Sequence, residues 1–91
     1  MFLHIGSGEI IAEEDIIGIF DMDTATVSKS TGKFLSSAEK KKRVIYTDSE
    51  IPKSFVVCKE KKGEKEKIFF SRISSTALKM RVGRFLEDEQ L

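Results

Sequence analysis

The hydrophobic and polar positions along this chain fall into short runs separated by turn residues, a pattern that predicts several short strands and two helices. Residues 1–5 are apolar except for His4, residues 6–8 read Gly-Ser-Gly, and residues 9–12 can form a second strand. Glycine and serine between two apolar runs are typical of a tight turn. The chain is therefore predicted to open with a β-hairpin.

The next apolar run, residues 16–20, reads Ile-Ile-Gly-Ile-Phe and is followed by Asp21. Strands that are apolar at both alternating positions are usually buried on both faces of a sheet. This run is therefore predicted to be a central, buried strand that ends at Asp21.

A first long helix is predicted from about Thr24 to Arg43, with Asp23 or Thr24 at the position that caps its N-terminus. At about 100° per residue, its apolar and basic residues fall on opposite faces. The apolar face comprises Val27, Phe34, Leu35 and Ala38, and the basic face comprises Lys29, Lys33, Lys40 and Arg43. Gly32 weakens the middle of this helix by about 1 kcal/mol relative to alanine.

After this helix, residues 44–46 can form a short strand, and Pro52 favours extended backbone in the residue before it. Residues 54–58 and 67–71 are predicted to form two strands that are joined by a charged tip. A last helix is predicted to begin after the capping residues 74–76. Its apolar face comprises Leu78, Val82, Phe85 and Leu86.

The resulting order of elements is β-β-β-α-(β)-β-β-α. This order predicts an α+β fold in which two helices cover a small, mostly antiparallel sheet. A chain of 91 residues is short enough to form a single domain. We predict that this domain spans residues 1–86 and that residues 87–91 form an acidic C-terminal tail.

The charged residues are sorted by position along the chain. Residues 1–27 hold six acidic residues and no lysine or arginine, whereas all sixteen basic residues lie between Lys29 and Arg84, together with six acidic ones. That stretch has a formal charge of +10, although the charge of the whole chain is only +1. A locally basic surface attracts polyanions, so DNA is a candidate partner.

Cysteine content and hydropathy narrow the class of protein further. Cys58 is the only cysteine, which excludes an internal disulfide and fits a reducing, cytoplasmic compartment. No run of about 18 apolar residues is present, and no basic segment precedes the apolar start, so we expect neither a membrane span nor a signal peptide. We also expect no cofactor and no metal site.

Asp21 and Asp23 suggest an alternative, enzymatic chemistry. An apolar strand followed by Asp-x-Asp is similar to the first motif of haloacid-dehalogenase-type phosphotransferases, in which the two carboxylates act as nucleophile and acid beside magnesium. That motif has Thr or Val two residues after the second Asp, where this chain has Ala25. Such enzymes also need a longer α/β domain, so we interpret both aspartates as a strand-end turn and helix cap and expect no enzyme.

The candidate DNA-binding residues are basic residues on or near the predicted helices and in the loop before residues 54–58. They are Lys29, Lys33, Lys40, Lys41, Arg43, Lys53, Arg72 and Arg81. Lysines outnumber arginines by twelve to four, which favours contact with phosphates over reading of guanine by arginine. The alternative to DNA contact by residues 40–43 is that they form a solvated helix end whose charges complement the helix dipole. The alternating charges of residues 59–67 favour a salt-bridged, solubilising hairpin tip.

Four segments lie in collinear order between Met1 and about Phe85: residues 2–6, 16–29, 52–57 and 71–81. Together they resemble the bacterial extracellular-matrix regulator family, RemA and RemB, and are more similar to its RemB branch. The resemblance implies a small α+β protein, akin in fold to LytTR-type DNA-binding domains. It also implies assembly into homo-oligomeric rings and an action on the transcription of biofilm-matrix genes.

This chain departs from the RemA branch at the arginines that are linked to DNA binding. In the loop before residues 54–58, Lys53 is the sole basic residue, and the earlier arginine position falls near Asp15. Any DNA contact is therefore expected to depend more on the stripe from Lys29 to Arg43, or to be made by another protein. The alternative function is a protein-protein interaction module without direct DNA binding. We also hypothesise that the acidic N-terminal part of one copy contacts the basic helix of a neighbour.

Overall fold

The structure is a computed structural model, and it describes residues 1–25, 28–47, 51–59 and 66–82. Its strands are β1 (Phe2–Gly6), β2 (Glu9–Ala12), β3 (Ile16–Asp21), β4 (Val44–Tyr46), β5 (Ser54–Cys58) and β6 (Lys67–Ser71). Its helices are α1 (Met22–Ala25), α2 (Lys29–Lys40) and α3 (Ser75–Arg81), and a 3₁₀ turn, η1, spans Glu13–Asp15. The predicted α+β class is confirmed, although the described residues form three α-helices where two were expected.

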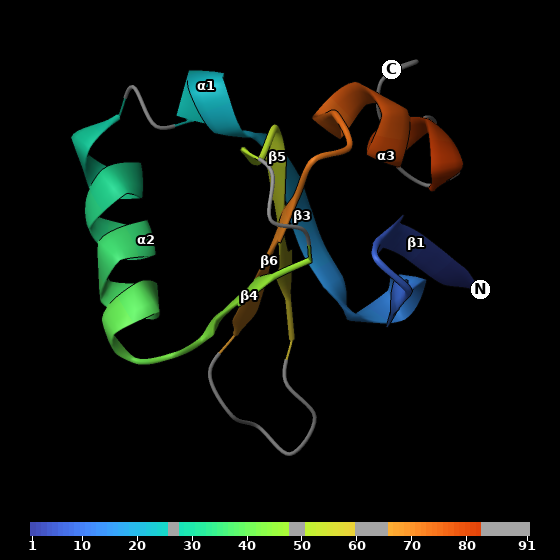
Figure 1. Cartoon of the computed structure of the whole chain (residues 1–91), viewed down its shortest axis with the longest axis horizontal. Helices are drawn as coiled ribbons and strands as arrows, with labels where there is room; N and C mark the ends of the chain where they lie inside the picture. The colour runs from blue at the N-terminus through green and yellow to red at the C-terminus, as the bar shows by residue number, and fades with distance from the viewer. Residues whose placement is uncertain (26–27, 48–50, 60–65, 83–91) are drawn as a thin grey trace.

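The strands form two sheets. β1 and β2 make an antiparallel hairpin, and the other four strands form one sheet in the order β3-β5-β6-β4. β5 is antiparallel to both of its neighbours, whereas β4 runs parallel to β6. In Figure 1 the four-stranded sheet stands between α2 on one side and β1 with α3 on the other. The sheet is mostly antiparallel, as predicted, but the opening hairpin is not part of it.

The predicted hairpin turn is confirmed. Gly6 pairs with Glu9, so Ser7 and Gly8 form the loop, and their φ angles are 49° and 81°. Positive φ at both loop residues is what a type I′ turn requires, and this turn matches the twist of the flanking strands. Gly6 has a φ of 121°, and a Cβ placed on it would lie 3.4 Å from Thr47 Oγ1. The positive φ favours glycine at this position, whereas the 3.4 Å separation is an ordinary van der Waals contact.

Each face of the four-stranded sheet has its own hydrophobic core. On one face the hairpin and α3 pack against β3 and β5, and the buried residues are Leu3, Ile5, Ile11, Ile16, Ile19, Val56, Cys58, Leu78 and Val82. On the other face α2 packs against the sheet, and the buried residues are Leu35, Ala38, Phe55, Val57, Ile68 and Phe70. All five residues of β5 are buried, because this strand lies inside the sheet and both of its faces are covered.

The prediction of a central position for residues 16–20 is wrong. β3 lies at the edge of the sheet beside β5, and Ile17 and Phe20 remain 52% and 42% exposed. Ile19 enters the core on one face, whereas Phe20 stacks on Phe55 on the other, with ring centroids 5.2 Å apart. An edge strand between two cores has the same apolar pattern as a central strand, so the pattern alone could not separate the two.

The prediction of one helix over residues 24–43 is also wrong. The structure has two helices, α1 and α2, and Ser28 before α2 has extended backbone with φ −77° and ψ 131°. Extended geometry is usual for the residue before the first helical turn. α1 also begins earlier than predicted. Its cap is Asp21, whose side chain accepts the N–H of Thr24, and not Asp23 or Thr24. Val27, which was predicted for the apolar face, lies outside the described residues.

α2 ends in a Schellman motif. The N–H of Lys42 donates to the carbonyl of Glu39 at 3.0 Å, and the N–H of Arg43 donates to the carbonyl of Ala38 at 2.9 Å. Lys42 has a φ of 59°, the left-handed conformation that glycine usually provides at this position. That conformation costs a residue with a side chain roughly 1 kcal/mol.

Buried hydroxyl groups connect the hairpin and α3 to the end of the sheet. Ser71 Oγ donates to the carbonyl of Ile5 at 2.7 Å and accepts the N–H of Ile73 at 3.0 Å. Ser54 Oγ donates to the carbonyl of Ile73 at 2.7 Å. Thr47 Oγ1 donates to Phe70 O at 2.8 Å and has a longer contact of 3.4 Å with the same Ile5 carbonyl.

The start of the last helix is confirmed. Ser74 Oγ accepts the N–H of Ala77 at 3.1 Å, and Leu78 and Val82 are buried as predicted. α3 ends at Arg81, and the predicted contacts of Phe85 and Leu86 lie outside the described residues, as does the tail of residues 87–91. The domain limits of 1–86 and the likeness to LytTR-type domains stay predictions.

Replacing Ser71 by alanine removes the acceptor of the Ile73 N–H and the 2.7 Å hydrogen bond to the carbonyl of Ile5. We expect the free energy of unfolding to fall by about 1–3 kcal/mol, the usual cost of an unsatisfied buried polar group. Urea denaturation followed by circular dichroism measures the change. The control is Ser36→Ala on the exposed face of α2, which should change stability by less than about 0.5 kcal/mol. Equal effects of the two substitutions would contradict the role given to Ser71.

Lys42→Gly should raise the free energy of unfolding by about 0.5–1 kcal/mol, because glycine adopts the left-handed conformation without the steric cost. The same denaturation measurement tests this expectation. Lys40→Gly, two residues earlier in the helix, removes the same charge but should lower stability by about 1 kcal/mol. A loss of stability in both variants would show that the left-handed conformation of Lys42 carries no cost.

Candidate nucleic-acid interface

Three lysines form a basic stripe on the exposed face of α2. Lys29, Lys33 and Lys40 are all exposed, and at 100° per residue they lie within about 40° of one another around the helix. From the first to the last, the helix rises by about 16 Å. None of the three has an ion pair within the part of the chain that the structure describes. We call these three residues the lysine stripe.

Small residues lie between the lysines. Gly32, Ser36 and Ser37, together with the lysine stripe, line a shallow groove of about 580 Å³. Short side chains let a sugar-phosphate backbone approach the helix, and serine hydroxyls commonly donate to phosphate oxygens. The pattern of charges alone did not predict these small residues. At 100° per residue both serines lie near Lys33 around the helix, so helical spacing would have predicted their place beside the lysines.

The opposite face of α2 fixes the direction in which the stripe points. Leu35 and Ala38 are buried in the core against the sheet, and Phe34 packs beside them. The lysine stripe therefore faces away from the sheet. Figure 1 shows that α2 forms one flank of the molecule, on the opposite side of the sheet from β1 and α3.

Arg43, which was predicted to extend the basic face, is directed toward β6 instead. Its Nη1 donates to the carbonyl of Glu66 at 3.0 Å and lies 3.4 Å from Glu66 Oε2, and its side chain is only 17% exposed. These contacts tie the end of α2 to the start of β6, so we assign Arg43 to the fold. Lys41, the C-cap of α2, is exposed at the same end of the helix.

A hydrogen bond also connects α2 with β4. The hydroxyl of Tyr46 donates to Glu39 Oε2 at 2.6 Å. The Glu39 carboxylate favours the protonated phenol and therefore raises the pKa of Tyr46. Because Glu39 binds this hydroxyl, the acid lies beside the sheet and apart from the lysine stripe.

Two further predicted residues come together at the start of β5. Lys53 and Arg72 line a hollow of about 410 Å³ with Ile51 and Ile73. The backbone of Lys53 is fixed on both sides, because its N–H donates to Ser71 O at 2.8 Å and its carbonyl accepts the N–H of Met22 at 2.9 Å. Lys53 and Arg72 thus form a second, smaller basic group.

Arg81 lies apart from these groups. Its Nη1 donates to the carbonyl of His4 at 3.1 Å, which connects the end of α3 to β1. The structure therefore divides the predicted residues into the lysine stripe with Lys41, the pair of Lys53 and Arg72, and two arginines that bond to other parts of the fold.

Asp21 and Asp23 occupy the positions expected of a strand end and a helix start. Asp21 Oδ2 accepts the N–H of Thr24 at 2.8 Å and so caps α1. Hydrogen bonds from the backbone and side chain of Thr24 lower the pKa of Asp21, and the charge of Lys79 acts in the same direction. Asp23 is exposed in the first turn of α1.

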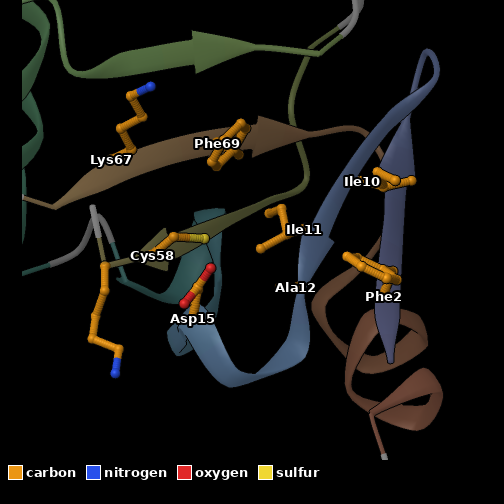
Figure 2. Close-up of a pocket in the computed structure, with 9 residues that line it drawn as sticks. Phe2, Ile10, Ile11, Ala12, Asp15, Cys58, Lys67 and Phe69 are labelled. Atoms are coloured by element: carbon orange, nitrogen blue, oxygen red, sulfur yellow. The ribbon is translucent and has the colours of Figure 1, made fainter. Parts of the chain in front are cut away.

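A second hollow, of about 400 Å³, lies between the hairpin and the ends of β5 and β6 (Figure 2). Its lining combines apolar and charged side chains: Phe2, Ile10, Ile11, Phe69, Asp15, Lys59 and Lys67. Cys58 also lines it, but this residue is buried in the core. Among the described residues, no group of three His, Cys, Asp or Glu could hold a metal ion.

Comparison with known proteins identifies the family. The model of the family described as RemA-like, extracellular matrix regulatory protein A-like, matches residues 2–82. The chain belongs to the RemA-like family. It is also 33% identical over 81 residues to extracellular matrix regulatory protein B of Bacillus subtilis (strain 168), a match that covers 89% of each chain. The resemblance stated from the sequence is thus confirmed, and the names of this RemA-like family describe regulatory proteins. No helix in the described part of this RemA-like chain is long and apolar enough to cross a membrane.

The cap at Asp21 predicts a pH-dependent contribution to stability. Because the folded state lowers the pKa of Asp21 below its ordinary value of 3.8, the stabilisation is present above that value and is lost as the pH falls through the lower, folded pKa. The stability difference between the wild type and Asp21→Ala should therefore be constant near neutral pH and shrink below about pH 4. Urea denaturation over a pH series measures it. Glu9→Ala, at an exposed position of β2, serves as a control, and the same pH trend in that variant would contradict the assignment.

Proposed function

We propose that this RemA-like chain is a non-enzymatic, cytoplasmic regulator of extracellular-matrix genes that binds DNA through the lysine stripe. The observation that carries the proposal is the stripe itself, three exposed lysines around a groove lined by small residues. Lysines that neutralise phosphates release condensed counterions, which drives binding to a polyanion. The name of the Bacillus subtilis relative supports the regulatory role.

The chemistry of the stripe favours contact with the DNA backbone over reading of bases. Lysine is a flexible point charge, whereas arginine offers the planar fork that binds guanine. Two of the predicted arginines, Arg43 and Arg81, donate to carbonyl groups within the fold. We therefore assign phosphate contacts to the lysine stripe and accessory phosphate contacts to Lys53 and Arg72.

Homo-oligomerisation is part of the proposal. One copy offers only a modest basic face, and several copies joined in one assembly, such as a ring, bind a long polyanion with much higher affinity because the later contacts are intramolecular. Such multivalency suits a module whose contacts are mainly with phosphates.

A protein-protein interaction module without direct DNA binding is the second candidate. It is favoured by an apolar groove of about 350 Å³ beside β3, which Ile17, Phe20 and Phe34 help to line. Association through this groove would depend little on salt, because burial of apolar surface drives it.

Binding to a labelled DNA duplex, measured by fluorescence anisotropy at about 50 and 200 mM salt, tests the proposal. The variant Lys29→Glu with Lys33→Glu should weaken binding by about tenfold or more at low salt. It should also reduce the slope of log affinity against log salt by about 2, since each phosphate contact contributes about 0.9. Both changes follow from the loss of two phosphate contacts.

The matched control is Lys59→Glu with Lys61→Glu, which changes the net charge equally at positions outside α2. Its affinity should stay within about threefold of the wild type if the stripe is the contact surface. Equal losses in the two variants would show attraction by net charge alone. A wild type that does not bind duplex at low salt would favour the protein-binding alternative.

A further inference from the structure

Both edges of the four-stranded sheet lack a neighbouring strand within the described residues. β3 pairs with β5 at one edge, and β4 pairs with β6 at the other. Unpaired edges are templates for a further strand, and proteins commonly guard them with lysine, proline or inward-pointing charge. β3 reads Ile-Ile-Gly-Ile-Phe-Asp and β4 reads Val-Ile-Tyr, so neither strand contains lysine or proline. Of the features that hinder pairing with a further strand, β3 has a bulge near Ile17.

The two edge strands run in the same direction. β3 is antiparallel to β5, β5 is antiparallel to β6, and β6 is parallel to β4. β3 is therefore parallel to β4 within one sheet. If the β4 edge of one copy joined the β3 edge of another with the α2 faces of both copies on the same side of the continued sheet, the two strands would pair in parallel and their N-terminal ends would lie side by side.

The residues at these N-terminal ends have opposite charge. β3 follows η1, whose three residues Glu13–Asp15 are all acidic. β4 follows residues 40–43, which are all basic, and of these Lys40 and Lys42 are exposed with no ion pair inside the described part of the chain. Glu14 is the most exposed part of the acidic turn. Parallel pairing thus brings a run of carboxylates beside a run of ammonium groups.

Pairing of β3 with itself is disfavoured by the same charges. An antiparallel contact between two β3 strands would bring Asp15 at one end of the strand toward Asp21 at the other. Like charges opposite each other on paired strands are destabilising. The β4 edge is thus the better partner for β3.

Apolar side chains on the two edges are compatible with this arrangement. On β4, Val44 and Tyr46 pair with Ile68 and Phe70, which places them on the α2 face of the sheet. Tyr46 is 56% exposed and contacts Phe70 edge to face, with ring centroids 5.0 Å apart. Phe20, which is partly exposed, lies on the same face and stacks on Phe55. An added β4 strand would therefore place the ring of Tyr46 beside the ring of Phe20.

We propose that copies of this chain assemble head to tail, with the β3 edge of one copy paired in parallel to the β4 edge of the next. The contact combines a continuous sheet with the charge pair between η1 and residues 40–43. A contact between two different surfaces repeats, so it closes into a ring or extends into a filament. The inference rests on the homo-oligomer of the proposed function and names its interface. Lys29 and Lys33, at the other end of α2, stay available in each copy.

Charge exchange across the contact tests this interface. Light scattering coupled to size-exclusion chromatography should give the wild type a mass above two copies, and Glu14→Lys and Lys42→Glu should each reduce it to the mass of one copy. An equimolar mixture of the two variants should recover the large mass, because each contact then pairs a lysine with a glutamate. Glu9→Lys, an equal change of charge at an exposed position of β2, should keep the wild-type mass.

Ile17→Lys provides a second test that does not depend on the charged flanks. Ile17 is half exposed, so a lysine there should leave the circular dichroism spectrum unchanged while it guards the edge of β3 and reduces the mass to one copy. A wild-type mass of one or two copies would overturn the interface together with the proposed ring. A large wild-type mass that all three variants keep would overturn the interface alone. DNA binding is measured separately with the Lys29→Glu and Lys33→Glu variant. A failure of the proposed DNA binding can therefore be told apart from a failure of the ring or of its interface.

Discussion

Hydrogen bonds of the Ser71 hydroxyl determine where the outer elements lie on the sheet. This group donates to Ile5 in the hairpin and accepts from Ile73 in the segment before α3. Hydrophobic burial is non-directional, whereas a hydrogen bond has a narrow range of distance and angle. The hydroxyl therefore holds the hairpin and α3 on one face of the sheet. Because the hairpin is fixed on that face and forms its own two-stranded sheet, it does not extend the sheet beside β3.

The two covered faces also separate the two kinds of charge. η1 connects the hairpin to β3 and carries three acidic residues, whereas α2 covers the other face and carries the lysine stripe. The net charge of only +1 thus conceals an acidic turn beside the hairpin and a lysine stripe on the opposite side of the sheet. Local potential governs the approach of a charged partner, so the overall charge is a poor guide to what this surface attracts.

Much of the fold was predictable from local signals, including the hairpin turn at residues 6–8, the cap at Ser74 and the burial of Leu78 and Val82. These features depend on residues that are close in sequence. The edge position of β3 and the inward direction of Arg43 depend on contacts with distant strands, which periodicity does not report. The lysine stripe was predictable because charge spacing on a helix fixes a face, whereas the meeting of Lys53 and Arg72 required the pairing of β5 with β6.

The size of the lysine stripe argues that a single copy is a poor DNA-binding protein. Three phosphate contacts give a slope of about −2.7 for log affinity against log salt, so a fourfold rise in salt lowers affinity about 40-fold. The stripe also lacks the arginine forks that would add affinity for particular bases. In the proposed assembly several copies compensate, because each further contact along the same duplex is intramolecular. The proposed DNA binding therefore depends on the edges of the sheet as much as on the basic helix, since the edges determine how many copies act together.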